Sequence, residues 1–247
     1  SLFGIGSGYG ALRVSSATAL NVLGQTFTPG PSGGTFGQSV PAMGEDDLID
    51  GLNPRAIAAV REDARFRTNL ILANASTISV QVFVTLLDAS GVQLGTKTYS
   101  LPPLGMTQVT QVVRDLGVSA DVANAVLLVS NVRLDAAIAA YASVIDRMTN
   151  DPRTLLPARD GQRPGGSWIL PSSARASGQG GAFYTTRLTL ANRTQTPATA
   201  TLQFLGHDAD GRAGVVKSFQ IAAGRATSWD DVLGGVFGVY SGYGAIR

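Results

Sequence analysis

Hydrophobic and polar residues alternate along several short stretches of the chain. The alternation is clearest in TNLILAN (68–74), VQVFVTLLD (80–88) and VQLGTKTYSL (92–101). A period of two, together with many β-branched residues, predicts β-strands, and the D-A-S-G sequence between the last two predicts a hairpin turn. Because turn signals recur every 8 to 12 residues or so, the chain is predicted to be all-β and to form antiparallel β-sandwiches.

Inward-facing aliphatic positions of these strands predict the hydrophobic core of one sandwich. The expected core residues are Leu70, Leu72, Val82, Val84, Leu86, Val126, Leu128, Ile138 and Tyr141. Two short amphipathic stretches, VTQVVRDLG (109–117) and SWDDVLGGVFG (228–238), predict one short helix in each half of the chain. Ser228 is expected to cap the second helix, with Asp231 reaching back as in a capping box.

The chain resembles itself at a period of about 117 residues. Residues 66–76, 80–91 and 98–107 align with 184–194, 198–211 and 218–227, and residues 125–158 align with 10–42. Self-similarity of this kind is typical of repeat architectures. We therefore expect residues 1–42 to be the second half of a repeat, 43–160 a complete repeat and 161–247 the first half of another.

One peptide occurs near both ends of the sequence. Residues 2–13 read LFGIGSGYGALR and residues 236–247 read VFGVYSGYGAIR. The chain is thus predicted to be a window on a periodic array, which is either one long polypeptide or a head-to-tail assembly of separate chains. Its 161–247 half is expected to be completed by a 1–42-type segment of the following unit, as a neighbouring copy or through a peptide bond. Gly6, Gly8 and Ala11 loosely fit a dinucleotide-binding pattern, but the strand, helix and acidic residue that this pattern requires are not predicted around them.

The quoted motifs also resemble a known class of domain. FRTNLILAN, LLDASGVQLGTKTYSLPPLG and VRLDAAIAAYASVIDRMTNDPRTLLPA are similar to tandem immunoglobulin-like β-sandwich repeats of large exported bacterial surface proteins. The resemblance covers residues 48–158 well and 168–247 more loosely, whereas residues 1–42 carry QTFT in place of AYASVID. It implies an extracellular or cell-surface location and a scaffold or stalk role, and it supplies no catalytic residue.

Composition narrows the possible functions further. Charged residues make up 15% of the chain, compared with about 25% in typical soluble domains, so the surface suits contact with copies of the same protein. Lys97 and Lys217 are the only lysines, and no run of basic residues predicts nucleic-acid binding. The absence of cysteine and the single histidine argue against thiolate and zinc sites. No apolar run approaches the roughly 18 residues of a membrane span.

Acidic residues in two places raise the question of a cation site. Asp208 and Asp210, like Asp88 in the matching turn, lie where hairpin turns are predicted, and the complete calcium-loop pattern is missing. The acidic stretch GEDDLID (44–50) is interpreted as a solvated linker, with weak binding of a divalent cation as the alternative. We predict no catalytic, cofactor-binding or metal-binding residue.

Further polar and aromatic residues allow a structural and a functional interpretation. Asn74 and Asn192 begin N-x-S/T sequons and are expected to end strands by bonding turn backbone, with glycosylation left open. His207 is expected to be a surface residue. Core or interface packing is expected for the aromatic residues, with a sugar-stacking platform as the alternative: Trp168, Trp229, Tyr9, Tyr184, Tyr240 and Tyr243.

Three functions follow from these patterns. A non-enzymatic structural protein of an extracellular filament, stalk or sheath, built by head-to-tail association, is favoured. An adhesin or carbohydrate-binding surface module is the alternative. A hydrolase is disfavoured because no polar constellation interrupts one repeat only.

Overall fold

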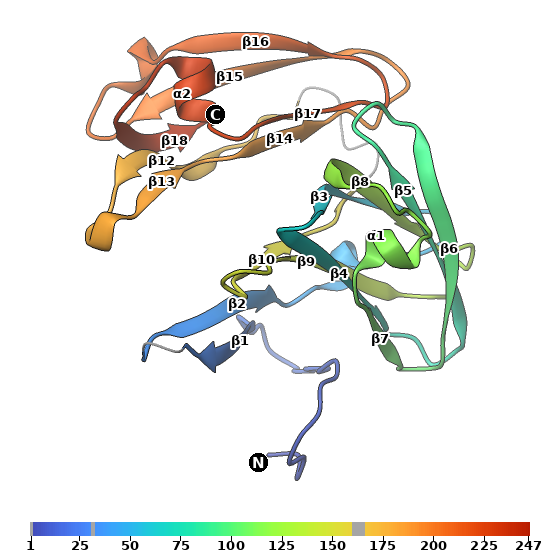
Figure 1. The fold of residues 1–247 in the computed structure, drawn as a ribbon. Helices are drawn as coiled ribbons and strands as arrows, with labels where there is room; N and C mark the ends of the chain where they lie inside the picture. Colours follow the sequence, from blue (N-terminus) through green and yellow to red (C-terminus); the bar gives the residue numbers. More distant parts are fainter. Residues whose placement is uncertain (1, 31–32, 160–165) are drawn as a thin grey trace. The chain divides into compact units, whose positions relative to one another are not determined.

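A computed structural model describes residues 2–30, 33–159 and 166–247 (Figure 1). The described chain is all-β, with antiparallel sheets and short helices, as predicted. It divides into unit 1, Ser1–Leu87 with Gln93–Arg159, and unit 2, Asp88–Val92 with Asp160–Arg247. The expected repeat boundary between residues 160 and 161 lies outside the described residues.

Unit 1 contains two antiparallel sheets with one hydrophobic core, which is consistent with a β-sandwich. The first sheet has the order β10 (Pro152–Leu155), β9 (Ile138–Asp146), β4 (Phe66–Asn74) and β7 (Met106–Val109). The second has the order β11 (Ala158–Arg159), β3 (Arg55–Glu62), β8 (Val122–Ser130), β5 (Val80–Leu87) and β6 (Gln93–Leu101).

Most of the predicted core of unit 1 is confirmed. Six of the expected residues lie in the buried cluster: Leu70, Leu72, Val82, Val84, Leu86 and Ile138. Val126 is buried as predicted, at 1% exposure, although it lies outside this cluster. The prediction was wrong for Leu128, which is only partly buried, whereas its neighbours Leu127 and Val129 belong to the cluster. Tyr141 is likewise replaced by Ala140 and Ala142. Both stretches are apolar on both faces, so their sequences do not specify which face points inward.

Unit 2 also contains two sheets, one of which is short. The larger has the order β13 (Phe183–Thr185), β12 (Leu170–Ser177), β18 (Gly242–Ile246), β15 (Ala198–Gly206) and β16 (Val216–Ile221). The smaller pairs β14 (Leu188–Ala191) with β17 (Ala226–Trp229). Its buried cluster is correspondingly small: Leu188, Leu202, Val232, Leu233, Phe237 and Ile246.

Each unit contains one short α-helix, as predicted: α1 (Val112–Asp115) and α2 (Val232–Phe237). Three 3-10 turns accompany them: η1 (Glu45–Asp47), η2 (Gln179–Gly181) and η3 (Gly211–Ala213). The predicted capping of α2 by Ser228 is wrong. Ser228 is still extended in β17, where it pairs with Thr189, and the helix is capped by Asp231, whose carboxylate accepts a hydrogen bond from the Gly234 amide at 2.9 Å.

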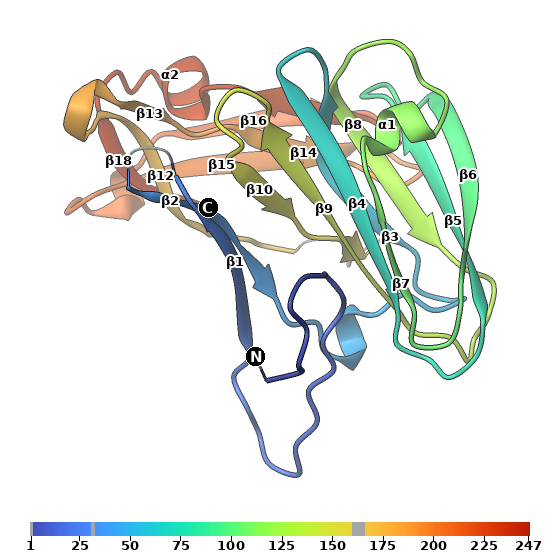
Figure 2. The same cartoon turned by 60° about the horizontal axis from the view of Figure 1, so that its bottom comes forward.

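An N-terminal hairpin forms a separate two-stranded sheet, β1 (Leu23–Pro29) with β2 (Thr35–Pro41), seen in Figures 1 and 2 as a ribbon apart from the sheets of unit 1. It is attached through β2, because the Gln38 side chain accepts a hydrogen bond from Ser143 at 2.9 Å. Thr154 also donates to the Ser39 carbonyl at 2.8 Å. β1 is left exposed along almost its whole length.

Candidate assembly surfaces

Strand pairing in unit 2 follows that in unit 1, except at one edge. β14 pairs with β17 in the same way as β4 pairs with β7. Leu188 is opposite Trp229 in unit 2, and the aligned Leu70 is opposite Val109 in unit 1. In unit 1, β4 is also paired along its whole length with β9, which in turn pairs with β10. Among the described residues nothing pairs with the second edge of β14. Its N–H and C=O groups therefore offer a template for another strand.

The first part of the corresponding strand in unit 2 has a different partner. Phe66, which aligns with Tyr184, pairs with Asp146 of β9 in unit 1. Tyr184 instead lies in β13 and pairs with Ala176 of β12 in the other sheet. What is a single strand in unit 1 is thus divided into β13 and β14 in unit 2. The division occurs where the β9 counterpart is missing, since backbone polar groups need partners.

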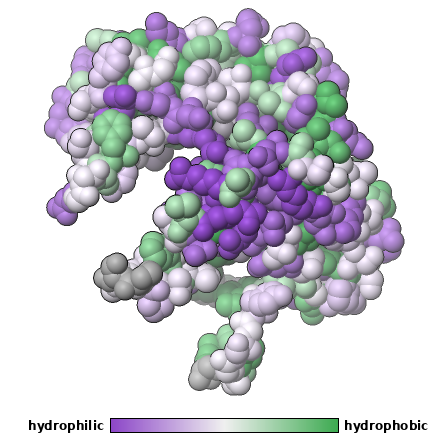
Figure 3. All heavy atoms as spheres, viewed as in Figure 1, coloured by the Kyte–Doolittle hydropathy of each residue, from purple (hydrophilic) through white to green (hydrophobic). Residues whose placement is uncertain are grey.

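The β1–β2 hairpin resembles β9–β10 in sequence and in strand pairing. Residues 10–42 align with 125–158, and both segments fold as an antiparallel hairpin, β1–β2 in one case and β9–β10 in the other. The hairpin carries apolar side chains with no core to enter: Leu23 is 77% and Phe27 65% exposed. Figure 3 shows further hydrophobic side chains on the N-terminal segment at the bottom of the view.

One face of the hairpin is hollowed around Phe27. Gln25, Phe27, Thr35 and Gly37 line a shallow open pocket. Gly37 makes room beside the ring, because a Cβ at this position would lie 2.8 Å from the Phe27 Cβ. β1 thus presents both an unpaired edge and an apolar face to solvent.

Asn74 forms a buried latch at the end of β4. Its side-chain amide donates to the carbonyls of Ile78 at 2.7 Å and Pro102 at 2.9 Å. Its side-chain oxygen accepts hydrogen bonds from the amide and hydroxyl of Ser76 at 3.0 and 2.6 Å. The predicted strand-ending role is confirmed. A glycan on this nitrogen would replace one of these two hydrogen bonds.

Asn192 makes the same latch in unit 2. Its amide donates to the carbonyls of Thr196 at 2.8 Å and Ala222 at 3.2 Å, and its oxygen accepts from Thr194 at 3.0 and 2.7 Å. Only 6% of the residue is exposed. The two sequons therefore mark one structural motif that occurs in both units.

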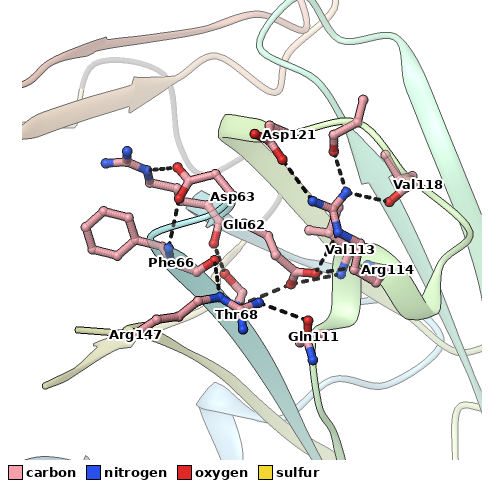
Figure 4. Close-up of polar contacts among 12 residues, drawn as sticks. Glu62, Asp63, Phe66, Thr68, Gln111, Val113, Arg114, Val118, Asp121 and Arg147 are labelled. Atoms are coloured by element: carbon pink, nitrogen blue, oxygen red, sulfur yellow. Dashed lines mark hydrogen bonds and ion pairs between the residues drawn. The ribbon is translucent and has the colours of Figure 1, made fainter. Parts of the chain in front are cut away.

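A buried carboxylate, which sequence reasoning missed, joins β3 to α1. Glu62 is fully buried and accepts hydrogen bonds from the amides of Thr68, Val113 and Arg114 at 3.2 to 3.4 Å (Figure 4). The Arg114 guanidinium lies 3.8 Å away and also bonds Asp121. Every contact is internal to unit 1, so the cluster has a structural role. The only signal in the sequence was a charged residue at an inward position of the strand.

In unit 2 a strand and the helix are also joined by charged side chains, but here the strand carries the arginine and the helix start carries the carboxylate. Arg175 on β12 lies 2.6 Å from the carboxylate of Asp231, which itself caps α2. Burial alone raises the pKa of Asp231, but the hydrogen bonds from Gly234 and Arg175 outweigh it and leave the pKa below its usual value. A carboxylate thus caps the helix in both units, from the neighbouring strand in one and from the helix start in the other.

The predicted acidic turns are confirmed. Asp88 accepts hydrogen bonds from the amides of Ser90 and Val92 at 2.8 and 2.9 Å. Asp210 is the N-cap of η3 and pairs with Arg212 at 2.6 Å. Asp208 lies beside His207, 3.1 Å away. Within residues 2–30, 33–159 and 166–247, no three His, Cys, Asp or Glu side chains converge on a possible metal site.

The acidic linker is only partly solvated. Glu45, Asp46 and Asp47 are exposed in η1, as expected. Ile49, however, is fully buried in the core of unit 1 and forms a β-bridge with Ile138. Asp50 then accepts hydrogen bonds that shape the following turn, from the Leu52 amide at 2.7 Å among others. The linker therefore anchors the start of the sandwich.

Of the expected core or interface packing of the six aromatic residues, core packing is confirmed for one, and interface packing of the others stays a prediction. Only Trp229 packs in the core of unit 2, with its ring centroid 4.8 Å from that of Phe219. The other five are more than half exposed: Tyr9, Trp168, Tyr184, Tyr240 and Tyr243. His207 is exposed, as predicted, and its ring lies 4.3 Å from that of Tyr243.

Comparison with protein-family models, curated protein sequences and solved structures gives no match. No helix within the described residues is long and apolar enough to cross a membrane.

Proposed function

We propose that this chain is a non-enzymatic structural repeat protein, which builds an extracellular filament, stalk or sheath by head-to-tail association of immunoglobulin-like β-sandwich units of about 117 residues. One observation carries the proposal. β14 of unit 2 has an unpaired edge where β4 of unit 1 has β9, and the aligned counterpart of β9 is β1, whose edge is exposed.

The arrangement favours association between copies. An added strand gains main-chain hydrogen bonds along the β14 edge, and alternate side chains enter the sheet's core face. On β9 the core-facing residues include Ile138 and Ala142, which align with Leu23 and Phe27 of β1. Both are exposed in the hairpin, so their burial stabilises the complex, by roughly 1.5–3 kcal/mol for a large apolar side chain.

The β1–β2 hairpin and the edge of β14 belong to different segments of the chain. Each copy added to an assembly therefore leaves one hairpin and one β14 edge unoccupied at the two ends. Such a heterologous contact extends into a filament when its rotation does not close into a ring. The low charge of the chain is compatible with close packing of copies. Its resemblance to repeats of exported bacterial surface proteins supports an extracellular location.

Engineered cysteines test the pairing directly, because the chain has none of its own. Ile71 of β4 is opposite Tyr141 of β9, and the aligned positions are Thr189 and Thr26. Directly opposed residues in antiparallel strands lie about 4.5–5.5 Å apart, within the range that a disulfide spans. A Thr26→Cys chain mixed with a Thr189→Cys chain should form a disulfide-linked heterodimer, and the double variant should form a ladder.

Thr199 provides a matched control. It is an exposed threonine on β15, in the larger sheet of unit 2, where it pairs with Gln220. Thr26→Cys with Thr199→Cys should cross-link only at the background rate. Equal yields for the two pairs, or a double Thr26/Thr189 variant that closes on itself as a monomer, would contradict the proposal.

A second candidate function is glycan binding, favoured by one observation in unit 2. The Arg175 guanidinium lies between two exposed rings, 5.3 Å from the Phe183 centroid and 5.7 Å from that of Tyr240. Exposed rings beside a charged donor suit stacking and hydrogen bonding to a sugar. A glycan array with the parent chain and a Tyr240→Ala variant tests it, and signal that the variant retains unchanged would exclude this site.

A further inference from the structure

The two copies of the repeated peptide share one backbone conformation in different surroundings. Gly4 and Gly238 have φ angles of 67° and 69°, and Gly8 and Gly242 have 157° and 158°. Residues 242–246 form β18 inside a sheet, whereas residues 8–12 have no strand partner. The N-terminal copy therefore shares the φ angles of two matching glycines with the second copy but lacks the strand contacts of β18.

The position of β18 in unit 2 is narrow and specific. β18 lies between β12 and β15, and Ile246 is 1% exposed opposite Phe204. A Cβ on Gly244 would lie 2.2 Å from the Leu205 carbonyl oxygen, so this position accepts only glycine. The N-terminal copy places Gly10 at this point and Leu12 at the position of Ile246, and Leu12 is 74% exposed.

Unit 1 shows how a complete unit uses this segment. Its β8 pairs with β5, with Leu127 opposite Leu86, and the chain then continues into β9. Ile246 opposite Phe204 is the matching pair in unit 2. The N-terminal segment aligns with β8 and continues into β1 over the same number of residues. A segment that aligns with β8 and a hairpin that aligns with β9–β10 thus follow each other in this order within residues 8–41.

We propose that residues 8–15 of a neighbouring copy enter unit 2 between β12 and β15 in place of β18, and so deliver the β1–β2 hairpin in register to β14. This strand exchange rests on the head-to-tail association proposed above. The partner of unit 2 is then the N-terminal segment of a second copy. The chain's own strand in this position, β18, is displaced.

The incoming strand has nearly the same sequence as the β18 strand that it would replace. Gly8, Tyr9, Gly10 and Ala11 each meet the contacts of an identical residue of β18, and Leu12 takes the place of Ile246. The incoming strand also carries Val14, which aligns with Val129 and is 56% exposed. Val129 is opposite Val84 in unit 1, so Val14 would pack opposite Leu202. Docking of the hairpin on β14 then favours the exchanged state.

A second cysteine pair reports this exchange separately from hairpin docking. Leu205 is opposite Ala245 of the resident strand, so Leu205→Cys with Ala11→Cys should cross-link between chains. Leu205→Cys with Ala245→Cys is the control that traps β18 within one chain. Oxidation of this trapped chain uses both of its thiols, so its association with an added parent chain is followed by sedimentation instead of cross-linking. The oxidised chain should bind the parent N-terminal segment more weakly than the reduced chain does, and reduction should restore binding.

Gly10 gives a variant that leaves its own chain undisturbed. No heavy atom lies within 4 Å of a Cβ built on Gly10 or on Gly6, so a side chain at either position has space. Gly10→Val should lower inter-chain cross-linking through residue 11 at least about tenfold, equivalent to a penalty of about 1.4 kcal/mol or more. Gly6→Ala should leave it unchanged, because the matching residue of the second copy is already Tyr240.

The two cysteine reporters separate the possible results. Cross-linking through both pairs, with loss of the residue 11 signal in Gly10→Val, supports the exchange. Cross-linking through Thr26 and Thr189 alone overturns the exchange and leaves head-to-tail docking in place. Absence of both cross-links contradicts the association itself and the exchange with it.

Discussion

The side-chain amide of Asn74 donates to the main-chain carbonyl of Pro102 at 2.9 Å and fixes the end of β4 to the turn that precedes β7. Asn192 repeats the contact to Ala222 in unit 2. A buried amide that uses all its donors and acceptors specifies a single local geometry. The latch places the ends of β4 and β14 in the same way, and the edge of β14 is the proposed acceptor.

Replacing Asn74 by aspartate should destabilise unit 1 strongly. The change places a carboxylate oxygen against the carbonyls of Ile78 and Pro102, which then lose their donor. Urea unfolding followed by circular dichroism should show a loss of about 2–3 kcal/mol. Asn21→Asp, at an exposed position, is the control and should change stability by less than about 0.5 kcal/mol. Equal effects for the two variants would contradict the latch.

Removal of the Glu62 carboxylate should loosen α1 from β3. Glu62→Ala leaves the buried amides of Thr68 and Val113 without acceptors, at an expected cost of about 2–3 kcal/mol. Hydrogen exchange at these two amides should accelerate in the variant. Glu45→Ala, in the exposed η1 turn, should leave their exchange unchanged. Unchanged exchange in Glu62→Ala would show that the carboxylate is dispensable.

The two candidate caps of α2 should differ in their effect on stability. Asp231→Ala removes the acceptor for the Gly234 amide and the partner of Arg175, and should cost about 1–2 kcal/mol. Ser228→Ala should cost less than about 0.5 kcal/mol, because Ser228 lies in β17. Tryptophan fluorescence during urea unfolding measures both, since Trp229 lies in the core of unit 2. A larger effect from Ser228→Ala would support the capping box after all.

The stability of unit 1 should depend on pH through Asp115 and Tyr99, which are 2.6 Å apart. Burial raises the pKa of Asp115, but hydrogen bonds from Tyr99 and Lys97 outweigh it and lower the pKa overall. Burial and the Asp115 carboxylate both raise the pKa of Tyr99.

The two shifts act at opposite ends of the pH range. The contribution of Asp115 is present above its unfolded pKa of about 3.9 and is lost as the pH falls through the lower folded value. That of Tyr99 is present below about pH 10 and is lost as the pH rises further. Urea unfolding across this range should show Tyr99→Phe losing less stability than the parent between about pH 10 and 11. Parallel curves would contradict the assignment.

The sequence predicted local features well where one face of a strand is apolar and the other polar. Alternation around Leu70 and Val84 placed both residues correctly in the core. It failed at Leu128 and Tyr141, which are only partly buried, in stretches whose two faces are both apolar or small. The hydrogen bonds of Asn74 and Asn192 to the turns that directly follow them were predicted correctly because they are local. The bonds to Pro102 and Ala222 were not predicted.

Long-range features were harder to predict. The burial of Glu62 depends on amides of α1, some fifty residues further along the chain, and no local pattern specifies that contact. The burial of Ile49 within the acidic linker was not predicted, because a single apolar residue among carboxylates gives no periodic signal. The proposed acceptor edge was recognised only by comparing the aligned strands of the two units, because β14 pairs with β17 alone among the described residues.

The central claim, that a β1–β2 hairpin of another copy completes unit 2 at β14, is tested most directly by native mass. The 247-residue chain is compared with a chain in which a second copy of residues 14–43 follows Arg247 without a linker, so that the hairpin is supplied in the same chain. Sedimentation should show particles that grow with concentration for the parent and a monomer for the extended chain. A parent that stays at 25.5 kDa at every concentration would contradict the account.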